Sequence, residues 1–168
     1  MKQLAGSTKV NPKHLLNIRD RVSLIGAMNT DQVNRLSQHL TVQWFTRNEK
    51  IFQKGDKPSD IFIVYRGEVA LYNEAANQPN QVQKLKQGDC FGESALIGIQ
   101  NQVLSAQTTE KTQLFILSRE ALLQLFEHDK ILFAILMMNL AREVSRDLHN
   151  VLSQQSRHQT EERLSKIS

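Results

Sequence analysis

Residues 89–106 constrain the fold more than any other part of the sequence. The segment begins as a short strand at residues 89–91, turns at Gly92, continues as a short helix over residues 93–97 and returns as a strand from Val103. A glycine at such a corner lets the backbone adopt a positive φ that side chains disfavour. The first helical residue is a carboxylate, which the partial positive charge of a helix N-terminus stabilises. The sequence therefore predicts a strand–turn–helix–strand unit inserted into β structure.

Short apolar strands precede and follow this unit. They recur about every 8–12 residues and are separated by turn residues such as Gly55, Gly67 and Gly88, a pattern typical of a jelly roll or barrel. The strands are expected at residues 42–46, 51–52, 61–65, 68–72, 82–85, 103–108 and 112–117. The chain is therefore predicted to form one mainly β domain.

Two helices are predicted before the first strand. An apolar pattern over residues 15–28 indicates the first, and Asn29 with Gln32 three residues later predicts a capping box that starts the second. Residues 1–19 are predicted to form a basic, flexible leader. The net charge of +4 resides in this region, because residues 1–21 hold five Lys or Arg against one Asp while the signs balance elsewhere. Such a leader is more often a solvated tail than a nucleic-acid contact.

Two helices are also predicted after the last strand. Ser118 is a favourable N-cap for the first, and residues 128–130 end it. A long helix is then expected from about Ile131, because apolar residues recur there at spacings of three and four. This stripe consists of Phe133, Met137, Leu140, Val144, Leu148 and Val151. It is predicted to form the seam of a homodimer, unless it packs on the chain's own strands. Residues 153–168 form a polar helical tail whose balanced charges argue against a helix that reads DNA.

The segment that starts at Phe91 resembles the phosphate-binding cassette of cyclic nucleotide-binding domains. That cassette has Phe-Gly-Glu, two or three apolar residues, a short loop and then Arg-Ser/Ala-Ala; this chain has Phe91-Gly92-Glu93 and later Leu104-Ser105-Ala106. With the turn glycines and the flanking helices, the resemblance covers residues 20–152 and extends to the sensory half of the bacterial catabolite-activator family. It implies an α+β, mainly β fold: an eight-stranded jelly-roll barrel flanked by N-terminal helices and a long C-terminal helix.

The resemblance also implies ligand contacts. In the family the glutamate accepts a hydrogen bond from the ribose 2′-hydroxyl, and the arginine pairs with the cyclic phosphate. Glu93 matches the first role, although it equally suits the start of the following helical turn. Leu104 stands where the family has its arginine. The candidate ligand-binding residues are Phe91, Gly92, Glu93, Ser94, Ala95, Gln102, Leu104, Ser105 and Ala106.

No nearby cation replaces the missing arginine. Between Lys86 and Lys111 the sequence contains three acidic residues and no Lys or Arg. A charge-assisted hydrogen bond contributes about 1.5–3 kcal/mol, a large share of the roughly −8 kcal/mol of micromolar binding. We therefore expect binding of cAMP and cGMP to be weakened or lost. Either Leu104 fills the phosphate position, or the pocket holds a less charged ligand, or an arginine such as Arg142 or Arg146 reaches in from the long helix or from a partner subunit.

Other chemistry finds no support in the sequence. Cys90 is the single cysteine, which excludes an internal disulfide and fits a reducing cytoplasm. No apolar run approaches the ~18–20 residues of a membrane helix, so no membrane insertion is expected. The five histidines are scattered, and no nucleophile–base arrangement or phosphate-binding loop is present. We expect neither a metal site nor an enzyme.

The sequence favours a non-catalytic regulatory domain that acts through protein–protein contacts, as a homodimer and with an unspecified protein partner. Its ligands would be cAMP, cGMP or a cyclic dinucleotide at weak affinity, or none. One alternative is a genuine sensor of a cyclic nucleotide or dinucleotide that relays binding through the C-terminal helix. Another is the sensory half of a truncated transcription regulator.

Overall fold

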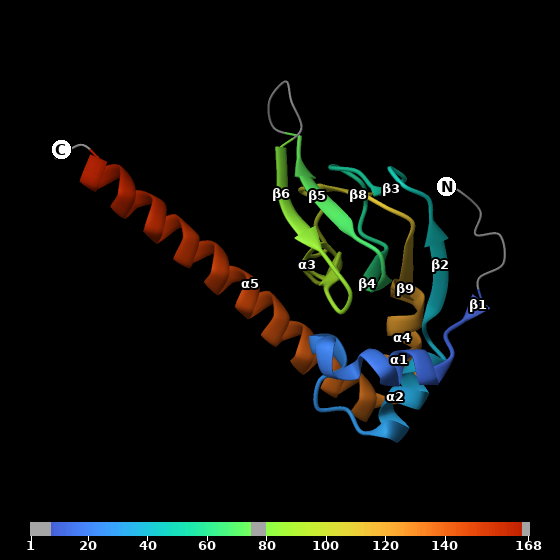
Figure 1. Ribbon diagram of the computed structural model, residues 1–168. Coiled ribbons are helices and arrows are strands. Elements are labelled where there is room, and N and C mark those ends of the chain that lie inside the picture. Colours follow the sequence, from blue (N-terminus) through green and yellow to red (C-terminus); the bar gives the residue numbers. More distant parts are fainter. Residues whose placement is uncertain (1–7, 75–79, 166–168) are drawn as a thin grey trace.

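The computed structural model describes residues 8–74 and 80–165, which form a β domain with helices at one end and one long helix that leaves it (Figure 1). The strands are β1 (Thr8–Lys9), β2 (Thr41–Phe45), β3 (Lys50–Phe52), β4 (Asp60–Arg66), β5 (Val69–Asn73), β6 (Asn80–Leu85), β7 (Cys90–Phe91), β8 (Ser105–Thr108) and β9 (Thr112–Ser118). The helices are α1 (Pro12–Ile18), α2 (Thr30–Ser37), α3 (Glu93–Gly98), α4 (Arg119–His128) and α5 (Lys130–Ser165).

The strands form two antiparallel sheets, in the orders β1-β2-β9-β4-β7 and β3-β8-β5-β6. This confirms the mainly β jelly-roll fold with flanking helices. The described residues contain nine strands rather than eight, because β1 adds an edge strand beside β2. The strand predicted from Val103 starts at Ser105 instead.

The central strand β4 is buried on both faces and separates two apolar cores. Successive side chains of a strand point to opposite faces. Ile61 and Ile63 therefore join the core under the helices, with Phe115 of β9. Phe62 and Val64 join a second core that lies between the two sheets. The cassette residue Phe91 belongs to this second core, so the cassette is anchored to the roll by packing.

The predicted flexible leader is wrong for the residues that the structure describes. Thr8 and Lys9 pair with β2, and Asn11 caps α1 by accepting a hydrogen bond from the backbone N–H of Lys13. Leu15 and Ile18 of α1 are buried in the core under the helices. Their burial stabilises this segment, at roughly 1.5–3 kcal/mol for each large apolar side chain. Residues 1–7 lie outside the described part.

The single helix expected over residues 15–28 is also wrong. α1 ends at Ile18, and two 3₁₀ turns follow, η1 (Arg19–Arg21) and η2 (Ser23–Ile25). Leu24 and Ile25 are adjacent and both fully buried. Both belong to the core under the helices. The tighter turns accommodate them.

The predicted helix ends are confirmed. The Asn29 side chain accepts from the backbone N–H of Gln32, and the Gln32 side chain accepts from the backbone N–H of Asn29, both at 2.9 Å. Ser118 caps α4 by accepting from the backbone N–H of Ala121 at 3.1 Å. The break at residues 128–130 separates α4 from α5. There Asp129 accepts from the backbone N–H of Leu132 at 3.1 Å and so caps the start of α5.

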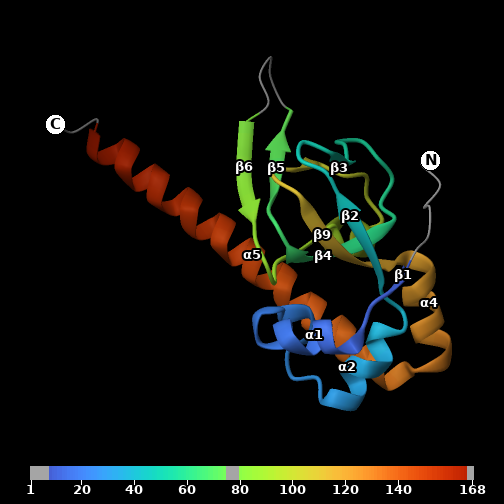
Figure 2. The same ribbon diagram turned by 45° about the vertical axis from the view of Figure 1, so that its right-hand side comes forward.

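Only the first part of α5 packs on the domain, and the rest extends away from it in both views (Figure 2). Leu132, Leu136 and Leu140 are fully buried in the core under the helices. The helix continues to Ser165, through most of the predicted tail at residues 153–168. Among the described residues, no helix is both long and apolar enough to cross a membrane.

The predicted dimer seam needs correction, because its first half is occupied by the chain's own core. Leu140 is fully buried there, and Phe133 and Met137 pack against the same core. Val144 is half-buried and Leu148 is exposed, while the Val151 side chain lies outside the described residues. A helix face turned toward its own domain is not available to a second copy.

Candidate functional site

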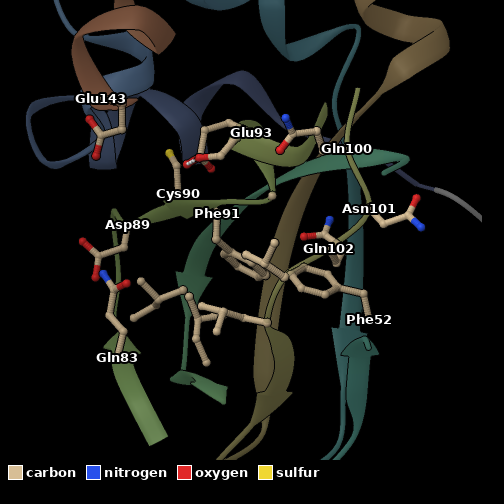
Figure 3. A pocket seen from close by; sticks show the side chains of 16 residues that line it. Phe52, Gln83, Asp89, Cys90, Phe91, Glu93, Gln100, Asn101, Gln102 and Glu143 are labelled. Atoms are coloured by element: carbon tan, nitrogen blue, oxygen red, sulfur yellow. Dashed lines mark hydrogen bonds between the residues drawn. The ribbon is translucent and has the colours of Figure 1, made fainter. Parts of the chain in front are cut away.

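The cassette encloses a cavity of about 440 Å³ (Figure 3). Its walls come from β3, the β5–β6 hairpin, the turn from β7 into α3, the loop after α3, and α5. The lining residues are Phe52, Leu71, Gln83, Leu85, Asp89, Cys90, Phe91, Gly92, Glu93, Ser94, Gln100, Asn101, Gln102, Val103, Leu104 and Glu143. This volume lies within the range of pockets that hold small organic ligands.

Gly92 makes the turn from β7 into α3. Its φ is +87°, and a Cβ at this position would lie 2.7 Å from the carbonyl oxygen of Asp60 and 3.2 Å from the Phe62 ring. A side chain is therefore excluded both by the backbone conformation and by contact with β4. The glycine is needed for the shape of the cassette whether or not a ligand is bound.

Glu93 is the first residue of α3, and its side chain lines the cavity while only 4% of the residue surface is exposed. The hydroxyl of Ser94 donates a hydrogen bond to one carboxylate oxygen at 3.1 Å (Figure 3). The position in the first helical turn suits a carboxylate. Helix capping and ligand contact are therefore compatible roles for the same side chain.

Leu104 lies where the family arginine is expected, and it packs against the core between the sheets. That core presents a cluster of aromatic rings to the cavity: the ring centroids of Phe62 and Phe91 lie 5.0 Å apart, and those of Phe52 and Phe91 lie 6.0 Å apart. Leu104 does not fill the cassette, because the cavity remains beside it. One side of the cavity is therefore hydrocarbon.

Gln102 faces Phe52 across this apolar side and is only 8% exposed (Figure 3). Its backbone is fixed by two hydrogen bonds: its N–H donates to the carbonyl of Asp56 at 2.9 Å, and its carbonyl accepts from the N–H of Gly55 at 2.8 Å. No hydrogen bond engages its side-chain amide within residues 8–74 and 80–165. An amide carries both donors and an acceptor, so the cavity offers one polar group of each kind here.

Two of the predicted ligand contacts, Ser105 and Ala106, do not line the cavity. The Ser105 hydroxyl donates to the Glu74 carboxylate at 2.5 Å and accepts from the backbone N–H of Lys54 at 2.9 Å, so it is engaged in the fold. Ala106 is fully buried in the core between the sheets. The Ala95 side chain lies outside the described residues. Phe91, Gly92, Glu93, Ser94, Gln102 and Leu104 do line the cavity.

The polar side of the cavity is acidic. Asp89, Glu93 and Glu143 contribute carboxylates, and no Lys or Arg occurs among the lining residues that the structure describes. Figure 3 shows Asp89 and Glu143 on the same side as Cys90. Ionised carboxylates are acceptors only, so this side favours ligands that donate hydrogen bonds.

The two arginines considered as substitutes lie elsewhere. Arg142 donates to the side-chain oxygen of Asn139 at 3.0 Å, and Arg146 pairs with Glu143 on its own helix. Both line a separate, open groove of about 650 Å³ between α5 and the segment around Gly26. Neither arginine lines the cassette cavity.

Cys90 borders the acidic side of the cavity. Burial raises the pKa of its thiol well above the usual range, and the neighbouring carboxylates of Glu93 and Glu143 raise it further. The thiol therefore stays protonated at neutral pH, and a protonated thiol is a poor nucleophile. Among the described residues, no group of three or more His, Cys, Asp or Glu is arranged to hold a metal ion.

Several lining residues were not predicted from the sequence. They come from outside the cassette and are brought to it only by the sheet topology and by α5: Phe52, Leu71, Gln83, Leu85 and Glu143. The apolar residues of the cassette also behave differently from one another. Ile97 and Ile99 are exposed to solvent, whereas Leu96 is buried under the helices and Leu104 packs against the core between the sheets.

A family profile described as "Cyclic nucleotide-binding domain" matches residues 42–129. Human cGMP-dependent protein kinase 2 is 30% identical over 83 residues, which cover 48% of this chain and 11% of the kinase. This chain spans between 11% and 14% of the length of the first curated relatives it matches.

Solved structures of low identity share the fold. A cyclic nucleotide-binding domain from Methylobacillus flagellatus has a TM-score of 0.78 at 19% identity, covering 89% of this chain and 84% of that one. The Thermus thermophilus catabolite activator protein has a TM-score of 0.71 at 24% identity, covering 80% and 62%. A cAMP-independent protein kinase A regulatory subunit from Trypanosoma cruzi, bound to guanosine, has a TM-score of 0.66 at 20% identity, covering 85% and 50%. Because the family profile matches more than half of its length, the chain belongs to the cyclic nucleotide-binding domain family.

Proposed function

We propose that this chain is a non-catalytic regulatory domain in which binding of cAMP and cGMP is weakened or lost. The observation that carries this proposal is the charge of the cassette cavity. Its described lining has three carboxylates, of which Glu143 is paired with Arg146, and Leu104 occupies the position of the family arginine. A cyclic phosphate placed there would meet carboxylates, neutral polar groups and hydrocarbon, and no cation among the described lining residues. A buried ion that lacks its partner costs about 3–5 kcal/mol, which reduces micromolar binding to the millimolar range.

The relatives support a regulatory role for the domain. The Trypanosoma cruzi regulatory subunit is described as cAMP-independent and binds guanosine, so the fold accommodates a ligand without a cyclic phosphate. In this chain the output would pass through α5, because Glu143 of that helix lines the cavity. A ligand or a partner that shifts α5 relative to the cassette would change the surface presented by the exposed half of the helix.

Homodimerisation through α5 is part of this proposal, along a stripe that shares only Leu148 with the predicted seam. Exposed apolar and small residues recur at alternating spacings of three and four, the pattern of a two-stranded coiled coil. This outer stripe consists of Ile131, Ala134, Met138, Ala141, Ser145, Leu148 and Leu152. Its small residues, Ala134, Ala141 and Ser145, permit close approach of a second helix. The open groove beside Met138 continues the same face.

A second candidate is the sensory part of a transcription regulator. It is favoured by the likeness to the Thermus thermophilus catabolite activator protein, of which this chain covers 62%. In that case the outer stripe of α5 would also join two copies, and the cassette would still require a ligand that tolerates its carboxylates. A genuine sensor of a cyclic dinucleotide fits the cavity less well, because such a ligand carries two phosphates.

Titration calorimetry with cAMP, cGMP and cyclic di-GMP tests the proposal. We expect dissociation constants weaker than about 100 μM for all three, since the missing charge pair costs at least two factors of ten. Low-micromolar binding of any of these anions to the unmodified chain would contradict the proposal.

A further inference from the structure

We propose that the cassette cavity binds an uncharged nucleoside, with the sugar hydroxyls directed at Glu93 and the base lying against the apolar side. This inference rests on the proposed function, because it assigns a ligand to the same cavity. The cassette lacks the family arginine, yet a cavity of about 440 Å³ remains beside Leu104.

The charge of the cavity selects against phosphates and in favour of hydroxyls. Glu93 is almost wholly buried, and Asp89 and Glu143 line the same polar side. An ionised carboxylate only accepts hydrogen bonds. Ribose hydroxyls donate such bonds, whereas a cyclic phosphate offers acceptors and adds a negative charge. Removing the phosphate therefore removes the repulsion and keeps the groups that the carboxylates bind.

The opposite side of the cavity suits a planar, largely apolar group. Phe52 and Phe91 line it together with Leu104 and two leucines from the β5–β6 hairpin. The faces of nucleobases stack favourably on aromatic side chains without requiring a particular base. Leu104 stands at the position of the family arginine, and its side chain can make only apolar contacts there.

The Gln102 side chain is the independent sign of a ligand. It is 8% exposed and lines the cavity, and no partner engages its amide in the described parts of the chain. Buried polar side chains normally have a hydrogen-bond partner. The amide lies on the side of Phe52 (Figure 3), where it can donate to and accept from the edge of a base at the same time.

The carboxylates, the aromatic side and the Gln102 amide together favour a nucleoside over a polyamine cation. A polyamine would satisfy the carboxylates, but it would leave the aromatic side and the Gln102 amide without complementary groups. A nucleoside offers hydroxyl donors, an apolar face and a hydrogen-bonding edge in one molecule of suitable size. It would also touch α5 through Glu143, so its binding would reach the helix directly.

Calorimetry on the full chain tests this inference with adenosine, guanosine, cytidine and uridine, each beside its 3′,5′-cyclic monophosphate, and with spermidine. We expect at least one nucleoside to bind at least 10-fold more tightly than its cyclic monophosphate. The 2′-deoxy form of that nucleoside should bind about 10-fold more weakly than the nucleoside itself. Gln102→Leu and Glu93→Gln should each weaken the nucleoside about 10-fold. Glu127→Gln, on the exposed surface of α4, is the matched control and should leave binding unchanged.

The outcomes separate this inference from the proposed function. If neither nucleosides nor cyclic nucleotides bind, the nucleoside assignment is wrong and the proposed function stands. If spermidine binds and nucleosides do not, the assignment is likewise wrong. If a cyclic nucleotide binds more tightly than its nucleoside, the nucleoside assignment is wrong, and if it binds with low-micromolar affinity the proposed function is wrong as well. Thermal unfolding of each variant identifies loss of folding, and Gln102→Leu provides the answer if Glu93→Gln does not fold.

Discussion

Arg35 of α2 forms an ion pair with Asp129, the residue that precedes α5. The same Asp129 accepts a hydrogen bond from the backbone N–H of Leu132 and so caps the long helix. One carboxylate thus joins the N-terminal helices to the start of α5. Asp129 is the only residue between α4 and α5, and its two contacts fix this junction to α2 and to the first turn of α5.

We predict that Asp129→Ala lowers the free energy of unfolding by about 1–2 kcal/mol, through loss of the helix cap and of the partly buried pair. Urea denaturation measures this change. Asp31→Ala is the matched control, because Asp31 also pairs with Arg35 but through an exposed contact within α2. It should cost less than about 0.5 kcal/mol. Equal effects of the two substitutions would contradict the role assigned to Asp129.

Asn139 fixes α5 to the end of the 3₁₀ turn η2. Its buried amide donates to the carbonyl oxygens of Leu24 and Gly26, at 3.0 and 2.8 Å, and accepts from Arg142. We predict that Asn139→Ala destabilises the fold by about 2–4 kcal/mol, because two carbonyls lose their donor at once. Arg142→Ala removes only the third bond at an exposed site, so the unfolding free energy should change by less than about 1 kcal/mol.

Gly92 precedes α3 and Gly98 ends it, but only Gly92 needs to be glycine. We predict that Gly92→Ala destabilises the domain by more than about 2 kcal/mol, because positive φ and the contact with Asp60 both oppose a Cβ. A Cβ on Gly98 would meet no atom closer than 3.7 Å. Gly98→Ala, within α3, should therefore be neutral or slightly stabilising. Chemical denaturation of the pair tests the difference, and similar losses would contradict it.

The fold was predictable because its signals are local. The Asn29–Gln32 capping box, the Ser118 cap and the apolar run around Phe62 each depend on a few neighbouring residues, and the structure contains all three. The leader was mispredicted because residues 8–13 are mostly polar, whereas the pairing of Thr8 and Lys9 with β2 depends on residues far away in the sequence.

The candidate site was predictable only where it follows the cassette. Glu93 and Gln102 lie in that segment, and both line the cavity. Glu143 lies fifty residues later, and its presence depends on the direction in which α5 leaves the domain. The role of Leu140 was misassigned for a related reason: the apolar spacing of a helix shows that a face is buried, but not whether it faces its own domain or a partner.

Restoring a cation tests whether the cassette backbone retains the geometry of the family. We predict that Leu104→Arg increases the affinity for cAMP or cGMP by about 10- to 100-fold, the equivalent of one charge-assisted hydrogen bond. Leu104→Met keeps the apolar character and should show no gain. The same arginine should not tighten nucleoside binding, since a nucleoside has no phosphate to pair with it. Absence of any gain would mean that the loop before β8 has a different shape.

The outer stripe of α5 provides the last prediction. If it joins two copies, Leu148→Glu should shift the chain from dimer to monomer, because like charges would face each other in the seam. Light scattering coupled to size-exclusion chromatography measures this shift. Leu123→Glu is the matched control, since Leu123 is equally exposed but lies on α4, away from the stripe. A wild-type chain that remains monomeric at the highest soluble concentration would rule out the stripe as a self-association surface.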